Sequence, residues 1–185
     1  MADNDNQLSA FQSSFKGGNR SHLYEVEMGW PDVVTNQPAM DKFLIRAINL
    51  PPSQINPIRV PYRGRILKWP GDRVYFPWTF RVLDDQPESG TGTNAKSIWH
   101  GFQRWSNAIN THDTNESSDD WGRFTKDWTV QQVGYGTEEG DSLKTVTLKD
   151  CWPTSVGPIT MDSNAIDTLV EFTVTVEYSW FEPRI

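Results

Sequence analysis

The sequence is poor in the residues that build cross-links and metal sites. It has a single cysteine, Cys151, so an intrachain disulfide is excluded and the fold must be stabilised by its core. Three histidines, His22, His100 and His112, are scattered and form no H-x-E or C-x-x-C spacing, which argues against a zinc site. No secretory leader pattern is present. Together with the lone thiol, this predicts folding in a reducing cytoplasm.

Long apolar runs and positive charge are also scarce. No apolar run approaches the ~20 residues that cross a bilayer, so we expect no membrane partner. Lys and Arg number 17 against 24 Asp and Glu, for a net charge of −7. Because phosphate contacts supply most of the affinity for nucleic acid, we do not expect DNA to be held tightly.

Catalytic patterns are missing as well. There is no Gly-x-Ser-x-Gly nucleophile elbow. Residues 90–97 come within one residue of a phosphate-binding loop, but Ala95 replaces the second glycine and the chain offers only one long helix, where nucleotide folds need several. We therefore expect no catalytic residue, no cofactor and no metal, and predict that the protein is not an enzyme.

Aromatic residues are plentiful, with nine Trp and nine Phe in 185 residues. This supplies a real core for one domain, which we place over residues 21–185. Residues 1–20 form a polar N-terminal arm in which Leu8, Phe11 and Phe15 would align on one side of a short helix. The arm is either a frayed terminus or a segment that docks on a neighbour.

Short alternating runs predict a mainly β fold. The last run, Leu169–Trp180, alternates over twelve residues and would extend ~40 Å as one strand with a wetted polar side. Its apolar side carries Val170, Phe172, Val174, Val176, Tyr178 and Trp180, and its polar side carries Glu171, Thr173, Thr175, Glu177 and Ser179. The earlier strands are expected over His22–Met28, Lys42–Ile48, Val74–Leu83, Thr125–Val133 and Leu143–Asp150.

One helix interrupts the strands, with Thr93 or Asn94 as its expected N-cap. Its apolar stripe predicts packing on a sheet and does not indicate a cofactor site. The stripe consists of Ala95, Ile98, Trp99, Phe102, Trp105, Ala108 and Ile109. Core positions are also expected for Trp78, Trp128 and Trp180, which lie on the apolar sides of strands.

A Pro- and Arg-rich stretch over residues 51–73 is long for a connection, which suggests a role of its own. It carries one acid, Asp72, and we expect Arg63 and Arg65 to lie on one side of an extended segment. The stretch is either a solvated loop or a clasp for an acidic surface, such as Asp3 and Asp5 or Asp119 and Asp120. Its cations are Arg59, Arg63, Arg65, Lys68 and Arg73.

Three co-linear stretches resemble one family. The first is Cys151-Trp-Pro-Thr-Ser-Val-Gly157 followed by the terminal alternating run, and the second is Leu50-Pro-Pro with Ile58-Arg-Val-Pro-Tyr-Arg-Gly-Arg65 and Pro70-Gly-Asp-Arg73. The third is Phe11-x-x-x-Phe15 with Tyr24-Glu-Val-Glu-Met28. In their order along the chain, these stretches are similar to the tail tube proteins of contractile-tailed (myovirus) bacteriophages, the T4-like tail tube family.

The resemblance implies two packed antiparallel sheets, a β-sandwich or partial barrel with one flanking helix, closing into a continuous β-barrel in a hexameric ring. Stacked rings would form a hollow conduit for genome delivery inside a contractile sheath, in the virion tail, after synthesis in the host cytoplasm. Its implied partners are other copies, the sheath, the baseplate or tube initiator, the tape-measure protein and the tail terminator, with DNA only in transit.

Two sets of site residues follow as expectations. The lumen candidates are Glu171, Thr173, Thr175, Glu177, Thr145, Thr147 and Lys149, and the inter-ring candidates are Arg59, Arg63, Arg65, Lys68, Arg73, Phe11 and Phe15. A tube initiator, or the tube of a secretion or bacteriocin-type injection machine, is the nearest alternative. A carbohydrate-binding β-sandwich is a more distant one, since exposed aromatic side chains stack on sugars.

Overall fold

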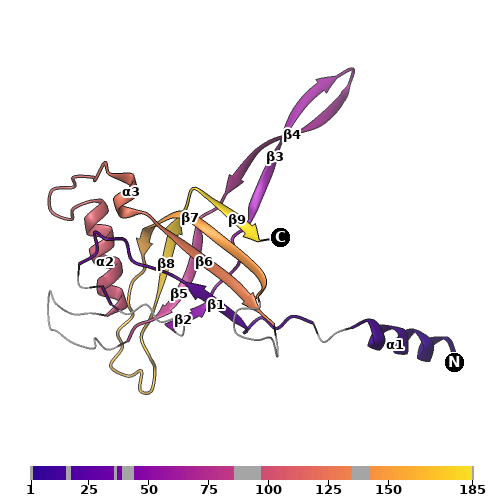
Figure 1. The fold of residues 1–185 in the computed structure, drawn as a ribbon, viewed down its shortest axis with the longest axis horizontal. Coiled ribbons are helices and arrows are strands. Elements are labelled where there is room, and N and C mark those ends of the chain that lie inside the picture. The colour runs from indigo at the N-terminus through magenta and orange to yellow at the C-terminus, as the bar shows by residue number, and fades with distance from the viewer. Residues whose placement is uncertain are drawn as a thin grey trace.

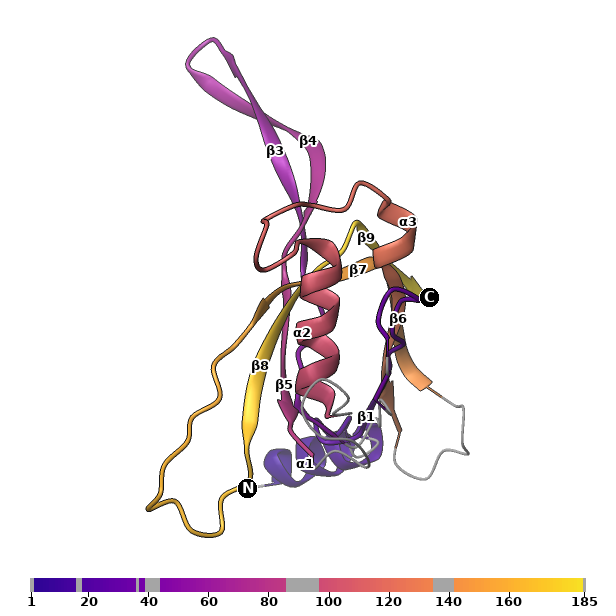
Figure 2. The ribbon, with the colours of Figure 1, turned by 90° about the vertical axis from the view of Figure 1, so that its left-hand side faces the viewer.

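The computed structural model describes residues 2–15, 18–35, 37–38, 44–85, 97–134 and 142–184. The body is one curled antiparallel sheet, and helix α2 (Ile98–Ile109) stands between its two halves (Figures 1 and 2). A two-stranded hairpin projects away from this body (Figure 1). The prediction of a mainly β fold is confirmed.

Seven strands build the sheet, in the order β1-β6-β7-β8-β5-β2, with β9 pairing to β7. All of the pairs are antiparallel. The two sheets that the family resemblance implies are therefore halves of a single sheet that share β7. The strands are β1 (Tyr24–Glu27), β2 (Ile45–Ala47), β5 (Trp78–Leu83), β6 (Lys126–Val133), β7 (Ser142–Val156), β8 (Glu171–Glu177) and β9 (Trp180–Arg184).

Strand β7 serves both halves because a bulge turns it in the middle. Lys126 pairs with Cys151 and Trp128 with Leu148, so β7 carries one residue more than β6 across this step. Asp150 adopts a positive φ of 57° at the same point. Bulges bend a strand and increase its twist. The expected strand end at Asp150 is therefore wrong: the strand continues to Val156.

The terminal alternating run does not form one long strand. β8 ends at Glu177, and the Ser179 N–H donates to the Lys149 carbonyl at 2.9 Å, where the chain moves to β9 and the other half of the sheet. The expected ~40 Å strand is thus wrong, as is the inward placement of its ends: Val170 is 38% exposed and Trp180 is 42% exposed. The inner members of the apolar row, from Phe172 to Tyr178, are buried as expected.

The remaining strands differ from expectation at their ends. Val74 belongs to the hairpin, and the break at Phe76 and Pro77 separates it from β5. The expected starts at His22 and Thr125 lie outside the strands, and residues 42–43 lie outside the described part of the chain.

The expected helix is α2, but its cap is Ser97. The Ser97 Oγ accepts a hydrogen bond from the His100 backbone N–H at 3.4 Å. Thr93, Asn94 and Ala95 lie outside the described residues. Two further helices are present among the described residues. α1 (Ala2–Ser14) lies in the arm, where the sequence analysis considered a short helix, and the short α3 (Trp121–Phe124) was not expected from the sequence. No helix among the described residues has the length and apolar character needed to cross a membrane.

The core is an aromatic cluster that links α2 to both halves of the sheet. Phe102 of α2 lies 6.5 Å from Trp128 of β6 and 6.3 Å from both Phe80 of β5 and Phe172 of β8, measured between ring centroids. Buried Trp side chains also need a partner for the indole N–H. Such bonds run from Trp78 to the Asn49 carbonyl, from Trp105 to the Phe124 carbonyl and from Trp128 to the Gly29 carbonyl, at 2.6, 2.7 and 2.9 Å.

Gly101 lets α2 approach the core closely. A Cβ at this position would lie 2.5 Å from Trp30 Cη2 and 2.9 Å from Pro38 Cγ. Trp30 is buried and donates to the Pro38 carbonyl at 2.9 Å, so it has little room to move.

We expect Gly101→Ala to lower the free energy of unfolding by about 1–3 kcal/mol, because overpacking outweighs the better helix propensity of Ala. Gly122→Ala in α3 is the matched control, since nothing lies within 4 Å of its Cβ position. It should leave stability unchanged or raise it by up to about 1 kcal/mol. Chemical denaturation of both variants checks this; equal effects would contradict the packing argument.

Candidate functional site

The face of the sheet that points away from the core is polar along its length. Residues two apart on a strand share a face, so the polar members of β7 and β8 alternate with buried apolar ones. Thr173, for example, lies between buried Phe172 and Val174, and Thr147 between buried Val146 and Leu148. The structure places all seven lumen candidates on this polar face: Thr145, Thr147 and Lys149 from β7, and Glu171, Thr173, Thr175 and Glu177 from β8.

The sequence analysis missed the contribution of the neighbouring strands to this polar face. Thr79 of β5 is hydrogen-bonded to Thr175 at 3.1 Å between the two hydroxyls. Gln131 of β6 donates to a Glu25 carboxylate oxygen on β1 at 3.1 Å. Their alternation with buried neighbours, such as Phe80 and Val130, was the signal that would have found them.

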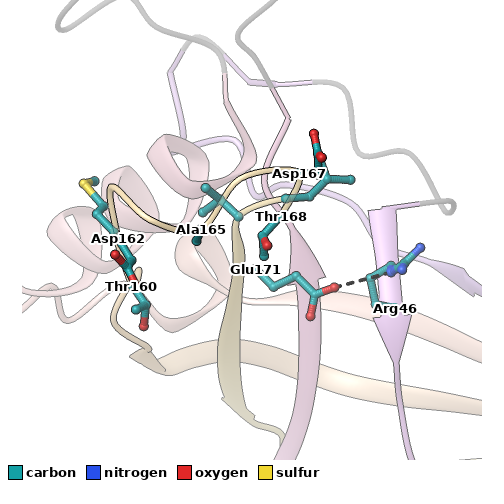
Figure 3. A pocket seen from close by; sticks show the side chains of 10 residues that line it. Arg46, Thr160, Asp162, Ala165, Asp167, Thr168 and Glu171 are labelled. Atoms are coloured by element: carbon teal, nitrogen blue, oxygen red, sulfur yellow. Dashed lines mark ion pairs between the residues drawn. The ribbon is translucent and has the colours of Figure 1, made fainter.

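Glu171 is not a free carboxylate. Its two oxygens lie 3.5 Å from Arg46 Nε and 3.6 Å from Arg81 Nη1. Figure 3 shows the Arg46 pair at the edge of a hollow of about 820 Å³ that residues 160–171 largely line. These partly exposed pairs neutralise charge more than they stabilise the fold.

Lys149 is paired as well, through a contact that also supports the bulge. The Asp127 carboxylate accepts from the Lys149 ammonium at 2.7 Å and from the Asp150 backbone N–H at 3.1 Å. Partial burial alone would raise the pKa of Asp127, but these two hydrogen bonds and the Lys149 charge hold that pKa below its ordinary value. Asp127 therefore fixes the position at which β7 bends.

The projecting hairpin consists of β3 (Ser53–Tyr62) and β4 (Arg65–Tyr75). Arg63 and Gly64 form its turn, with φ values of 46° and 80°. A turn with positive φ at both central residues is the type I′ turn that joins two strands tightly. The expectation that Arg63 and Arg65 share one side of an extended segment is therefore wrong, because the chain reverses between them.

The two faces of the hairpin differ in chemistry. One face carries exposed apolar side chains, and the other carries the Arg59–Lys68 pair beside Pro61 and Ile66. At the tip, the Arg63 guanidinium lies 5.4 Å from the centroid of the Tyr62 ring. The apolar face consists of the cross-strand pairs Ile58–Trp69 and Val60–Leu67, followed by Tyr62 opposite Arg65.

Helix α1 and Phe15, which follows its last residue, expose the three apolar residues that the sequence placed on one side of a short helix. Leu8, Phe11 and Phe15 are all exposed, and the rings of Phe11 and Phe15 stack with their centroids 5.3 Å apart. The two stacked rings cover part of each other's surface. The side chains of Asp3 and Asp5 lie outside the described part of the structure.

Within the described ranges, no three acidic, His or Cys residues are grouped so as to hold a metal ion. Cys151 is buried, and desolvation raises the pKa of its thiol far above the ordinary range.

A family model described as phage tail tube protein matches residues 19–182. The chain belongs to this family. The tail tube protein of Serratia phage KSP90 is 26% identical over 179 residues, which cover 94% of this chain and 93% of that protein. The tail tube protein gp19 of Enterobacteria phage T4 is 24% identical over 140 residues, covering 76% of this chain and 80% of that protein.

Solved structures share the fold. A chain in the cryo-EM structure of the PVC sheath/tube terminator, from an extracellular contractile injection system, matches with a TM-score of 0.62 at 16% identity. That match covers 93% of this chain and all of the other. A chain of the PVC sheath–tube complex matches with a TM-score of 0.52 at 14% identity, covering 94% and 95% of the two chains.

The family makes this chain a structural subunit of a tail tube. Phage tail tube proteins are virion components, and the structural character of the family indicates a role without catalysis. The resemblance to this family that the sequence indicated is thereby confirmed.

Asp127 provides a test of the bulge. We expect Asp127→Ala to lower the free energy of unfolding by roughly 1 kcal/mol, a value discounted for a half-exposed side chain, because both hydrogen bonds are lost. Asp127→Asn should cost less, since an amide oxygen can still accept from the Asp150 N–H.

The deficit of Asp127→Ala should also depend on pH. Since the pKa of Asp127 is depressed in the folded state, its contribution is present above the ordinary Asp pKa of about 4 and is lost as pH falls through the lower folded value. Denaturation curves from pH 7 down to pH 2.5 check this. A deficit that is independent of pH would show that the charge of Asp127 contributes nothing.

Proposed function

We propose that copies of this chain form rings in which the polar sheet face lines a channel, and that the rings stack into a hollow conduit for genome delivery inside a contractile sheath. The observation that carries the proposal is that the polar face continues across the strands, while the side chains of the opposite face are buried in the core. A face of this kind on a curled sheet suits the wall of a channel.

The strand edges support closure between copies. In the described chain, β1, β2 and β9 each pair with one strand only. An unpaired edge leaves backbone N–H and C=O groups available for another chain. Pairing between neighbours in a ring satisfies these groups and gives a continuous β-barrel, for which we propose six copies on the strength of the family resemblance.

The charge arrangement suits DNA in transit. Lys149 and Arg81 on the polar face are each paired with a carboxylate, Asp127 and Glu171 respectively. Hydroxyl groups such as Thr173 and Thr175 keep the surface wet, and the remaining carboxylates repel phosphate. DNA would therefore slide along the channel without being gripped.

The hairpin and α1 are the parts that reach outward, and we assign them to contacts between rings. Sheath, baseplate or initiator, tape-measure and terminator proteins are the further partners, with assembly after synthesis in the host cytoplasm. The likeness to chains of extracellular contractile injection systems favours one second candidate, the tube of such a machine, which has the same architecture.

Assembly of the purified protein tests this function. We expect hexameric rings and hollow tubes in negative-stain electron microscopy, with light scattering that rises steeply with protein concentration. A strict monomer at every concentration and salt, with no filaments, would overturn the proposal.

The lumen assignment has its own test. A phage carrying Thr173→Arg and Thr175→Arg should form tubes of normal length but release DNA more slowly, because two cations per subunit attract phosphate. The matched control places the same two charges on the exposed 111–120 loop, as Thr114→Arg and Ser118→Arg. Equal ejection rates for the two phages would contradict a lumen position for Thr173 and Thr175.

A further inference from the structure

The hairpin and the loop of residues 157–170 lie at opposite ends of the body. In both views the hairpin tip points up and the loop hangs below the lower ends of β5 and β8 (Figures 1 and 2). The two strands of the hairpin, about ten residues each, reach about 33 Å from the sheet. A projection at one end and a receptive surface at the other is the arrangement that allows head-to-tail stacking.

The tip of the hairpin is basic and apolar at once. Arg63 and Arg65 lie at the turn, with the exposed ring of Tyr62 beside them. Behind them the apolar face continues through Val60 and Leu67, which are both exposed. The tip thus presents exposed apolar surface beside two neighbouring cations, and no described contact from the same chain covers it. Such a surface is typical of a docking element.

The 157–170 loop has the complementary chemistry. Asp162 and Asp167 line the hollow of about 820 Å³ together with Glu171 and with Arg46, which is the one cation among the described lining residues (Figure 3). Residues 157–170 contain no Lys or Arg, and the described residues give Asp162 and Asp167 no ion-pair partner. The most exposed apolar side chains of the same loop are those of Met161, at 86%, and Ile166, at 81%.

The geometry points to docking of the hairpin tip of one copy into the 157–170 hollow of the next copy. This inference rests on the proposed tube. Arg63 and Arg65 meet Asp162 and Asp167, and Tyr62 with the apolar hairpin face covers the loop's exposed apolar side chains. Arg binds carboxylate in a bidentate manner, which fixes the register between copies as well as adding affinity.

The other acidic surface considered from the sequence is less suitable. Asp119 and Asp120 precede α3, which lies toward the same end of the body as the hairpin (Figure 2). Copies that stack in one orientation present opposite ends to each other. The 157–170 hollow faces an incoming hairpin, whereas the loop before α3 does not.

A charge exchange tests the docking. Arg63→Asp with Arg65→Glu should weaken tube growth while leaving rings intact, so that elongation needs a protein concentration at least about tenfold higher. Asp is chosen at residue 63 because it tolerates positive φ better than most residues. Adding Asp162→Lys and Asp167→Asn should restore tubes; Asn suits the φ of 63° at residue 167.

The matched control combines Arg63→Asp and Arg65→Glu with Asp119→Lys and Asp120→Lys, and it should stay without tubes. The docking is wrong if this control regains tubes or if Arg63→Asp with Arg65→Glu elongates normally. It is also wrong if the quadruple variant with Asp162→Lys and Asp167→Asn folds into rings but never elongates. Wild-type protein that forms no tubes under any condition would instead contradict the proposed function itself.

A crosslink gives a second readout that does not depend on charge reversal. Cys151 is buried, so cysteines introduced at exposed positions are the reactive thiols. Oxidation of tubes made from Arg65→Cys, Asp162→Cys protein should give a ladder of linked subunits on a non-reducing gel. The Arg65→Cys, Asp119→Cys pair should give none, and the reverse pattern would overturn the docking.

Discussion

One bent strand holds this architecture together. β7 pairs with β6 and β9 in one half of the sheet and with β8 in the other, and the bulge at Asp150 lets it do both. The bulge also shifts the alternation by one residue: Val146 and Leu148 face the core before it, and Cys151 faces the core after it. Without that shift, the second half of β7 would turn its apolar side to water, because a one-residue slip reverses the two faces of a strand.

The curl around this strand is stabilised from inside by aromatic packing. Phe102 contacts rings on β5, β6 and β8, so α2 joins the two halves rather than covering one of them. Because each buried indole N–H in this cluster has a carbonyl partner, the core gains apolar burial without leaving a Trp donor unpaired. The apolar side chains committed to this core leave the opposite face to hydroxyl, amide and carboxylate groups.

Charge is distributed unevenly over the molecule, in a way that separates its surfaces. On the polar sheet face the cations Lys149 and Arg81 are paired within the chain. On the hairpin, the Arg63 guanidinium lies over the Tyr62 ring and has no ion pair with a described residue, and the 157–170 loop holds carboxylates without cations. The cations of the polar sheet face are thus neutralised, while the hairpin tip and the 157–170 loop carry charges of opposite sign.

The sequence alone determined the local pattern: the mainly β class, the apolar row from Phe172 to Tyr178, the aromatic stripe of α2 and the polar face that all seven lumen candidates share. Alternation and helical spacing are local properties, so they can be read without the fold. The sequence did not determine where strands end. The bulge at Asp150, the break after Glu177 and the turn at Arg63 depend on pairing with residues far along the chain. Likewise, only the tertiary structure placed the 157–170 loop at the end opposite the hairpin, because the relative position of two distant surfaces is set by the path of the chain through the whole sheet.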